Sequence, residues 1–577
     1  MASKLLLAPA EVEVERRADG CVVLRSPRPL PPPARCVTAW LTRWADAAPD
    51  RTFVAEREGD GWRALTYRDA LDAVRRIGQA LLDRGLGPDR PVAILSDNGV
   101  DHALLALAAM HVGVPVAPIS PAYSLMSKDF GKLAHVMALV RPGLVFAAEP
   151  ARYAAALAAI GATSTSVDEL RATTPGPAVD RAHAAVDGDH VAKLLFTSGS
   201  TGLPKGVINT HRMLTTNQEQ LATAWPFVAT RPPVLVDWLP WNHTFGGNHD
   251  FNLVLRNGGT LYVDGGKPVP GLIETTARNL RAIAPTMYFN VPRGFDLLLP
   301  LLEDDAALRA NFFRELDVVF YAAAALPLNL WRRLEAVAAR AGRADVAMLS
   351  AWGSTETSPL ATSVHFPMAG PGVIGLPVAG CELKLVPSGA KLEVRVRGPN
   401  VTPGYLHQPE LTRAAFDDEG FYRIGDAVKL ADPTDPSRGV VFDGRVAEDF
   451  KLATGTWVHV GAVRTRLIAA GDPVIADAVI TGHDRDALGA LVFLTPAAAA
   501  LTPAALAAHL TAALERLRAD GGGSSTCPSR LMVMTEPPSS DANEITDKGY
   551  LNQRAVLDRR AALVERLHAA AEPIVLG

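Results

Sequence analysis

Apolar and polar residues alternate along the N-terminal half of the chain in a way that predicts helices and strands in turn. Residues 71–82 carry apolar side chains at helical spacing, after a capping box formed by Thr66 and Asp69. Short apolar runs at 92–95 and 114–118 predict strands. Strands that alternate with helices in this way predict a parallel sheet covered by helices.

The pattern changes near residues 443–447, beyond which the predicted strands and helices form a smaller, mixed α+β unit. A chain of 577 residues also exceeds one ordinary hydrophobic core. We therefore expect an α/β protein with a large N-terminal domain of helix-covered sheets, residues 1–443, and a smaller C-terminal domain, residues 444–577. The proline-rich residues 1–35 are predicted to be an irregular leader over the surface.

Composition narrows the class of protein. A net charge of -4 argues against bulk nucleic-acid binding, and four scattered cysteines without CxxC spacing disfavour disulfides or a zinc site. The apolar run at 5–8 is too short for a signal peptide, and the apolar stretch at 103–119 is interrupted by glycine and proline. We expect a cytoplasmic protein with no nucleic-acid partner and no membrane span.

A short stretch rich in glycine and hydroxyl residues lies between two predicted strands, 194–196 and 207–208. Glycines let the backbone bend closely around a ligand, and hydroxyl and N–H groups donate to phosphate oxygens. Lys205 adds a positive charge, so the stretch predicts a loop that binds polyphosphate. It is not a Walker A loop, because Pro204 stands where that pattern has its second glycine and Gly206 follows the lysine. The alternative is a flexible hairpin turn.

Two carboxylates lie near the ends of later predicted strands. One strand is expected to end at Gly353, and hydroxyl residues then surround Glu356. Such a glutamate can ligate magnesium, which often takes one carboxylate together with substrate phosphates. Asp426 follows another predicted strand and can accept both hydroxyls of a ribose. The alternatives are a solvated glutamate and an ordinary aspartate turn.

The segment 234–247 brings aromatic and polar residues beside two glycines, which suggests a turn bordering a cavity. It contains His243, which is either part of that cavity or a hydrogen-bonded core histidine. The run of alanines at 322–325 follows an apolar stretch, as does the turn at Asn290. Small residues there either leave room for a ligand or permit close packing.

Taken together, these segments have the order and rough spacing of the adenylate-forming superfamily, which includes acyl-CoA synthetases, luciferases and peptide-synthetase adenylation domains. The resemblance covers about residues 40 to 555. The chain is similar to four of the family's motifs, namely the phosphate loop at 197–206, the Thr-Glu motif Trp352-Gly-Ser-Thr-Glu356, the ribose motif Tyr422-Arg-Ile-Gly-Asp426 and the inter-domain motif Gly444-Arg445.

The resemblance implies ATP, Mg²⁺ and CoA as cofactor or co-substrate, and it implies roles for individual residues. The implied catalytic residues are Lys548, Lys205, His243, Thr355 and Glu356, with Glu356 as the metal ligand. The implied nucleotide-binding residues are Thr197, Ser198, Gly199, Ser200, Thr201, Gly202, Lys205, Trp352, Gly353, Ser354, Thr355, Asp426, Arg445 and Lys451. The implied acid pocket comprises His243, Asn290, Tyr321, Ala322, Ala323, Ala324 and Trp352.

Within the superfamily the chain most resembles the feruloyl-CoA synthase group, through the phrases at 209–213, 447–457 and 541–550. This implies a ligase that forms an acyl adenylate from ferulate or a related hydroxycinnamate and then the CoA thioester, releasing pyrophosphate and AMP. The C-terminal domain would be mobile and rotate between the two steps, and the protein would be a monomer or homodimer. The alternatives are a fatty or benzoic acyl-CoA synthetase, a stand-alone enzyme that loads a carrier protein, and a silent nucleotide-binding scaffold.

The chain departs from the family's usual pattern at three places. The usual hinge position holds Ala447, with Glu448 next to it, so the resemblance leaves the hinge residue open. Ala462-Val-Arg464 replaces the familiar Glu-Ile-Glu, and Lys548 precedes Gly549, whereas the family's lysine follows a glycine.

Overall fold

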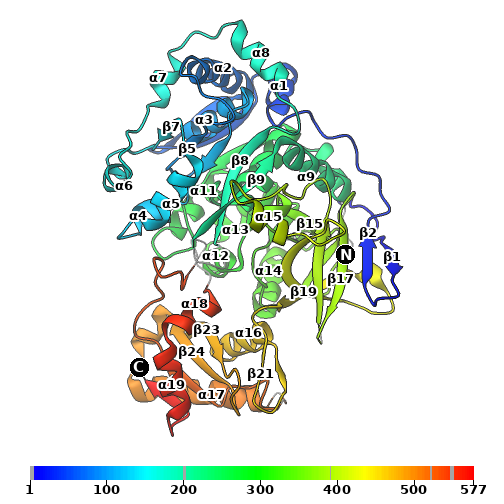
Figure 1. Ribbon diagram of the computed structural model, residues 1–577, viewed down its shortest axis with the longest axis vertical. Coiled ribbons are helices and arrows are strands. Elements are labelled where there is room, and N and C mark those ends of the chain that lie inside the picture. Colours follow the sequence, from blue (N-terminus) through cyan, green and yellow to red (C-terminus); the bar gives the residue numbers. More distant parts are fainter. Residues whose placement is uncertain are drawn as a thin grey trace.

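The computed structural model describes residues 5–198, 203–389, 391–519, 521, 523–545 and 551–576. A five-stranded sheet, covered on one face by helices α2 (Tyr67–Asp83) and α3 (Val100–His111), forms the upper part of the molecule in Figure 1. Its strands, in spatial order, are β7 (Leu144–Phe146), β5 (Val92–Ile94), β6 (Val116–Pro118), β8 (Val191–Ser198) and β9 (Pro204–Thr210). All pairs are parallel except β8 with β9.

The sequence predictions for this part of the chain are confirmed. Helix α2 begins after Thr66, whose hydroxyl oxygen accepts the Asp69 N–H at 3.2 Å and whose O–H donates to the Asp69 carboxylate at 2.7 Å, so Thr66 is the N-cap. The predicted runs at 92–95 and 114–118 form β5 and β6, which pair in parallel.

Eleven strands of the described chain form the central sheet, and a four-stranded sheet stands beside it. The central sheet runs β1 (Glu13–Arg16), β2 (Val22–Arg25), β17 (Glu382–Ser388), β18 (Lys391–Arg397), β19 (Tyr422–Leu430), β20 (Val440–Arg445), β16 (Val373–Pro377), β15 (Leu360–Ser363), β14 (Ala347–Gly353), β13 (Val318–Tyr321) and β12 (Met287–Asn290). The smaller sheet runs β10 (Val234–Asp237), β11 (Thr260–Val263), β3 (Thr52–Glu58) and β4 (Gly61–Thr66).

Residues 13–25 are not irregular, so the prediction of an irregular leader over residues 1–35 is wrong for this stretch. β1 and β2 form an antiparallel hairpin, and β2 pairs with β17. Val23 and Leu24 are fully buried, so the hairpin contributes apolar surface to the core. The prolines that suggested an irregular leader all follow Arg25, and they hid the short alternating stretch before them.

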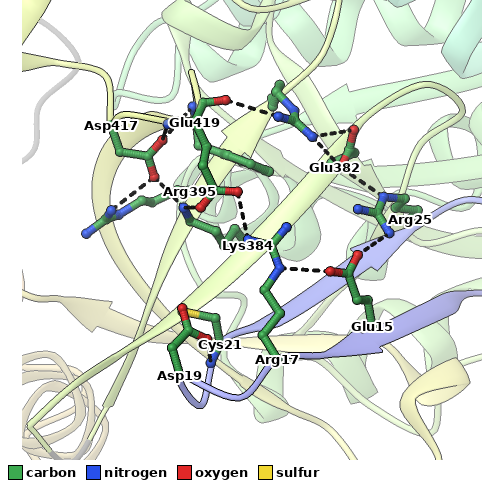
Figure 2. A network of polar contacts seen from close by, with 12 residues as sticks. Glu15, Arg17, Asp19, Cys21, Arg25, Glu382, Lys384, Arg395, Asp417 and Glu419 are labelled. Carbon is green, nitrogen blue, oxygen red and sulfur yellow. Dashed lines mark hydrogen bonds and ion pairs between the residues drawn. The ribbon is translucent and has the colours of Figure 1, made fainter.

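A network of ion pairs joins this hairpin to the central sheet (Figure 2). Arg17 pairs with Glu419 at 2.7 Å, and Glu419 in turn pairs with Lys384 at 2.6 Å. Lys384 also contacts Asp417 at 2.6 Å, and Arg395 contacts the same carboxylate at 3.0 Å. Burial alone would raise the pKa of the Asp417 carboxyl, but hydrogen bonds from Lys384, the Phe421 N–H and Arg395 lower it to about 2.

The C-terminal part of the chain has its own core and lies at one end of the long axis in Figure 1. Its sheet runs β23 (Ile475–Thr481), β24 (Gly489–Leu494), β25 (Arg530–Val533) and β26 (Ile574–Leu576). Around it lie the short pair β21 (Phe450–Lys451) and β22 (Trp457–Val458) and the helices α16 (Val460–Ala470), α17 (Pro503–Ala519), α18 (Gln553–Arg559) and α19 (Ala561–Ala569).

The predicted fold, a large α/β N-terminal domain with a smaller α+β C-terminal domain, is confirmed. The predicted boundary, with 1–443 and 444–577 as the two domains, remains a prediction. The last strand of the central sheet ends at Arg445, and the C-terminal core begins at Phe450. Over the residues that the structure describes, helices of the length and apolar character needed to span a membrane are absent.

We predict that Asp417→Asn destabilises the protein by about 2 kcal/mol at neutral pH, because the folded state then loses a carboxylate that it holds ionised. The folded pKa lies below the unfolded one, so this stabilisation is complete above about pH 4 and is lost as pH falls toward 2. Urea unfolding of both proteins between pH 3 and 7 measures the difference.

The exposed neighbour Asp418 provides a matched control as Asp418→Asn. A loss of stability at Asp417→Asn that stays constant down to pH 3, or one that Asp418→Asn shares, contradicts the role of the network.

Candidate active site

Three parallel strands of the central sheet, β12, β13 and β14, end side by side. Their register aligns Asn290 with Tyr321 and Tyr321 with Ser350. Ligands of such sheets bind beyond the carboxyl ends of the strands. Because side chains alternate between the two faces of a strand, neighbouring residues at these ends face different parts of the molecule.

One face of these strand ends carries small and apolar side chains. Val291, Ala322 and Ala351 pack at the edge of the main hydrophobic core, half-buried. Sequence analysis named only Ala322 of these three, although the two-residue period of a strand would have pointed to Ala351 as well. The next two alanines differ, since Ala323 and Ala324 are exposed and Ala323 has a positive φ of 72°.

Asn290 and Tyr321 lie on the opposite face. Asn290 is fully buried, donates from Nδ2 to the Tyr288 hydroxyl at 3.1 Å and accepts the Val291 N–H at 2.8 Å. Tyr321 packs edge-on against Trp331 at 6.1 Å in a second core. The structure therefore does not bring these two predicted pocket residues together with Ala322.

Aromatic rings fill the space below the small residues. The π-helix η2 (Phe245–Asp250) packs against β12 and β13 through Phe245, whose ring lies 5.7 Å from Phe320 and 6.4 Å from Phe289. His249 stacks on Phe320 at 5.3 Å. These buried rings form a floor under the strand ends. This aromatic floor was not predicted from the sequence, because the contacts join segments far apart in the chain.

His243 lies in the turn just before η2 and is half-buried. Its carbonyl accepts the Gly247 N–H at 2.8 Å, and its Nδ1 faces the Phe245 N–H at 3.4 Å. The turn is tightly packed, since a Cβ on Gly246 would lie 2.1 Å from the Leu239 carbonyl oxygen. The two glycines are thus required for the approach of η2 to the preceding segment.

Tyr405 links two predicted site residues. Its hydroxyl donates to Glu356 Oε1 at 3.1 Å and accepts from Lys205 Nζ at 3.3 Å, and it lies 3.1 Å from the Tyr422 hydroxyl. Glu356 is 6% exposed, and Lys205 lies on β9. Burial lowers the pKa of the Lys205 ammonium, and the nearby Glu356 carboxylate partly offsets this effect.

A second group of contacts centres on Asp426. The Trp352 indole Nε1 donates to Asp426 Oδ2 at 3.0 Å, and Arg445 Nε lies 3.0 Å from Oδ1. Asp426 was predicted to follow a strand, but it lies within β19, paired in register with Arg445 of β20. The apolar run that marked the strand continues on the far side of the carboxylate. Burial raises the pKa of Asp426, and Arg445 and the Trp352 N–H oppose this rise.

The two groups are adjacent. Tyr422, which contacts Tyr405, belongs to the same strand as Asp426, and the charge on Glu356 also contributes to the raised pKa of Asp426. The structure thus brings Lys205, Glu356, Trp352, Asp426 and Arg445 into one cluster, and their roles remain predictions. Tyr405 was not predicted as a contact residue, because an isolated tyrosine carries no signal in a single sequence. Tyr422 was named only as the first residue of the ribose motif, without a contact of its own.

The remaining predicted residues are placed as follows. Thr197 is paired in register with Lys205, and its Oγ1 is buried without a hydrogen-bond partner among the described residues. Thr355 and Glu356 form the short 3₁₀ helix η3 (Thr355–Thr357), preceded by Ser354 and by Gly353, where a Cβ would meet the Pro359 carbonyl oxygen at 1.6 Å. Lys451 lies on β21, exposed, 5.0 Å from the centre of the Trp457 ring.

Some predicted residues lie outside the described part of the chain. They are Gly199, Ser200, Thr201 and Gly202 of the polyphosphate loop, the side chain of Ser198, and Lys548. The strands on either side of that loop pair antiparallel, so the loop joins a β-hairpin, and hairpin geometry and phosphate binding are not exclusive alternatives.

Glu356 fits the predicted magnesium ligand. Within the described residues, no group of three or more histidine, cysteine, aspartate or glutamate side chains is arranged to hold a metal by itself. Magnesium bound to a nucleotide needs less, since one carboxylate and the phosphates suffice. The second oxygen of the Glu356 carboxylate would supply that ligand.

Comparison with known proteins agrees with this geometry. The model of the AMP-binding enzyme family matches residues 41–406, and the model of the AMP-binding enzyme C-terminal domain matches residues 451–572. The computed structure resembles the anthranilate CoA ligase AuaEII in complex with anthranoyl-AMP, with a TM-score of 0.73 at 20% identity over 93% of this chain and 99% of the other. At that identity the likeness concerns the fold.

Two curated relatives are similar in sequence. The chain is 30% identical over 464 residues to the probable non-canonical nonribosomal peptide synthetase CymA of Salinispora arenicola. The matched region covers 76% of this chain but only 5% of CymA. It is 29% identical over 410 residues to an indenyl-propanoyl:CoA ligase of Mycobacterium tuberculosis, covering 68% of this chain and 76% of the other. The chain therefore belongs to the AMP-binding enzyme family, and the predicted membership of the adenylate-forming superfamily is confirmed.

We predict that Trp352→Phe raises the dissociation constant of AMP about five-fold, which corresponds to the loss of one hydrogen bond of about 1 kcal/mol. An aromatic ring stays at position 352, but Asp426, the residue predicted to bind ribose, loses the indole N–H from which its carboxylate accepts. Calorimetric titration of the purified variant with AMP measures the effect. Trp331→Phe, in a buried core away from the site, is the control, and equal weakening in both variants contradicts the role of Trp352.

Proposed function

We propose that this member of the AMP-binding enzyme family is an AMP-forming ligase that joins an aromatic carboxylic acid, ferulate or a related hydroxycinnamate, to CoA. The acid attacks the α-phosphorus of ATP and gives an acyl adenylate and pyrophosphate. The CoA thiol then displaces AMP and forms the thioester. The observation that carries the proposal is the cluster in which Lys205 and Glu356 share Tyr405 beside the Trp352–Asp426–Arg445 group.

The cluster answers the main electrostatic problem of the first step. A carboxylate has to approach a polyphosphate, and each uncompensated pair of like charges about 4 Å apart costs roughly 4 kcal/mol at an effective dielectric of about 20. Lys205 supplies one cation at the end of the polyphosphate loop. Magnesium, held by Glu356, would neutralise the phosphates, and Lys548 would add a further cation from the C-terminal domain. Asp426 would accept the ribose hydroxyls, with Arg445 beside it.

The shape of the strand ends supports a short, flat acid. Val291, Ala322 and Ala351 leave a wall with little side-chain bulk, whereas the rings of Phe245 and Phe320 close the space beneath it. An aromatic ring fits between an alanine wall and an aromatic floor. A long acyl chain would have to displace buried rings. This favours an aryl acid over the fatty acid that the sequence left open.

Two other points support this proposal. One curated relative is named as a CoA ligase, and the structural neighbour holds the adenylate of an aromatic acid. The similarity to CymA favours a second candidate function, in which the enzyme adenylates an acid and loads it on a carrier protein. The first half-reaction is the same in both, so only the acceptor distinguishes them.

A panel of acids tests the proposal. AMP release should require ATP and CoA, and it should be fastest with ferulate, p-coumarate or caffeate and at least about ten-fold slower with benzoate or dodecanoate. AMP release that requires a carrier protein instead of CoA supports the second candidate. ATP binding without AMP release under any condition contradicts both and leaves the scaffold.

We predict that Glu356→Gln raises the magnesium concentration needed for half-maximal AMP release at least five-fold, because a neutral amide is a poorer ligand for a hard cation than a carboxylate. Circular dichroism should show an unchanged fold. The surface variant Glu335→Gln is the control. An unchanged magnesium response of Glu356→Gln would remove this residue from the metal site.

A further inference from the structure

Lys193 is a buried lysine without an acidic partner. It lies on β8 with 5% of its surface exposed, and no aspartate or glutamate in the described part of the chain forms an ion pair with it. Its Nζ donates to the Gly247 carbonyl oxygen at 2.5 Å and lies 5.8 Å from the centre of the Phe251 ring. Burying an ammonium that has only a neutral acceptor costs folding free energy, so the presence of Lys193 at this position needs an explanation.

The surroundings of Lys193 are almost entirely apolar. It borders a small cavity of about 20 Å³, enough for one water molecule, which is lined by side chains of α3 and β6 together with Trp241 and Phe251. Two histidines lie within electrostatic reach, His102 on α3 and His211 on α9 (His211–Ala224). Burial lowers their pKa values to about 4 and about 3, so both are neutral near pH 7.

The acceptor of Lys193 connects it to the site. Gly247 belongs to η2, and its N–H donates to the carbonyl oxygen of His243, which is a predicted acid-pocket residue. A Cβ on Gly247 would lie 2.3 Å from the Trp241 carbonyl oxygen, so the backbone at Gly247 is tightly packed against Trp241. In the wide π-helix, carbonyl groups lack the partners that they would have in an α-helix. Gln218 Nε2 donates a hydrogen bond to the carbonyl oxygens of Asn248 and His249, at 3.2 Å each.

We propose that Lys193 is a positioning residue for the acid pocket, holding the Gly247 carbonyl and, through it, the turn that carries His243. The inference rests on the proposed function, because it treats His243 and the start of η2 as part of the acid site. Lys193 does not contact the Lys205–Glu356–Asp426 cluster in the described chain, so its effect falls on the acid and not on the nucleotide.

The charge state of Lys193 adds a pH dependence. Burial lowers the pKa of its ammonium to about 7. Below that pH the ammonium donates a charge-assisted hydrogen bond to Gly247, and above it the neutral amine donates a weaker one. The hydrogen bond by which Lys193 holds the turn therefore weakens as pH rises through 7, whereas the neighbouring histidines stay neutral over this range.

The lowered pKa of Lys193 also makes the stability of the protein depend on pH. The unfolded chain keeps Lys193 protonated up to about pH 10, so between pH 7 and 10 the unfolded state binds more protons and stability rises with pH. Below pH 7 the folded state carries the whole cost of the buried charge. Replacing Lys193 with an apolar side chain of similar length therefore stabilises the protein most at low pH.

The experiment compares wild type, Lys193→Met and the control Lys429→Met, an exposed lysine on β19, with the preferred acid of the panel. We expect Lys193→Met to raise KM for the acid at least five-fold at pH 6.5 and KM for ATP less than two-fold. In wild type, KM for the acid should rise between pH 6 and 8.5 with an apparent pKa near 7, and this rise should be absent in Lys193→Met.

Two further measurements keep the test decisive. Lys193→Met should raise Tm relative to wild type at pH 6 by more than at pH 9. Lys193→Gln keeps an N–H donor, so its KM for the acid should stay close to that of the wild type. This KM should no longer depend on pH. The glutamine variant also replaces the methionine variant in the test if the latter fails to fold.

The possible failures are distinguishable. A wild type that releases AMP with none of the acids overturns the proposed function and this inference with it. An active wild type whose KM for the acid is unchanged in Lys193→Met, or in which the KM values for acid and ATP rise together, overturns this inference alone.

Discussion

The site depends on one contact, in which the Tyr405 hydroxyl donates to the Glu356 carboxylate and accepts from Lys205. Lys205 lies on β9 and Glu356 lies in the 3₁₀ helix η3, and a lysine and a glutamate this close would ordinarily pair directly and cancel. The tyrosine holds the two at a separation that leaves both charges available. In the proposed function the carboxylate is kept for a metal and the ammonium for phosphate, so that both would face the same ligand, as a preorganised site requires.

The floor and wall of the proposed acid pocket follow from strand alternation. Because β12, β13 and β14 are parallel and in register, their ends present one row of small side chains to η2 and a different row to the helices on the other face. In the proposed pocket, substrate selection would therefore be concentrated in few positions. A change at Ala322 or Ala351 would alter the proposed pocket, whereas a change at Tyr321 alters the packing against Trp331.

The sequence predicted the parts of the molecule that local pattern determines. The cap at Thr66 and the parallel strands were predicted from periodicity, whereas the grouping of Glu356 with Asp426 was implied by the resemblance to the adenylate-forming superfamily. What it could not predict depends on distant residues. The role of Tyr405 arises from Lys205, 200 positions earlier in the chain. The order of residues 13–25 arises from the pairing of β2 with the distant strand β17, and ion pairs such as that of Arg17 with Glu419, 402 positions away, add to it.

The placement of Asn290 shows the same limit in another form. A polar residue at the end of a buried strand favours a ligand site when only the sequence is known. In the structure its two polar groups are used by the Tyr288 hydroxyl and the Val291 N–H, under the start of α12 (Pro292–Asp304). A Cβ on Gly294 would lie 1.9 Å from the Asn290 Oδ1, so the asparagine fills the space beneath that helix. Neighbouring groups thus take up the hydrogen bonds of Asn290, which was predicted to line the acid pocket.

Buried ion pairs constrain the predicted rotation of the C-terminal domain. The segment 446–448 lies between two residues held by the central sheet, Arg445 by Asp426 and Asp449 by Lys391 of β18. Both Asp449 and Lys391 have side chains that are almost fully buried. A rotation about 446–448 would have to separate this second pair, and separating buried charges is costly unless new partners or water replace the contact. Two discrete domain arrangements, each with its own partners for Asp449, satisfy this constraint better than a continuous swing.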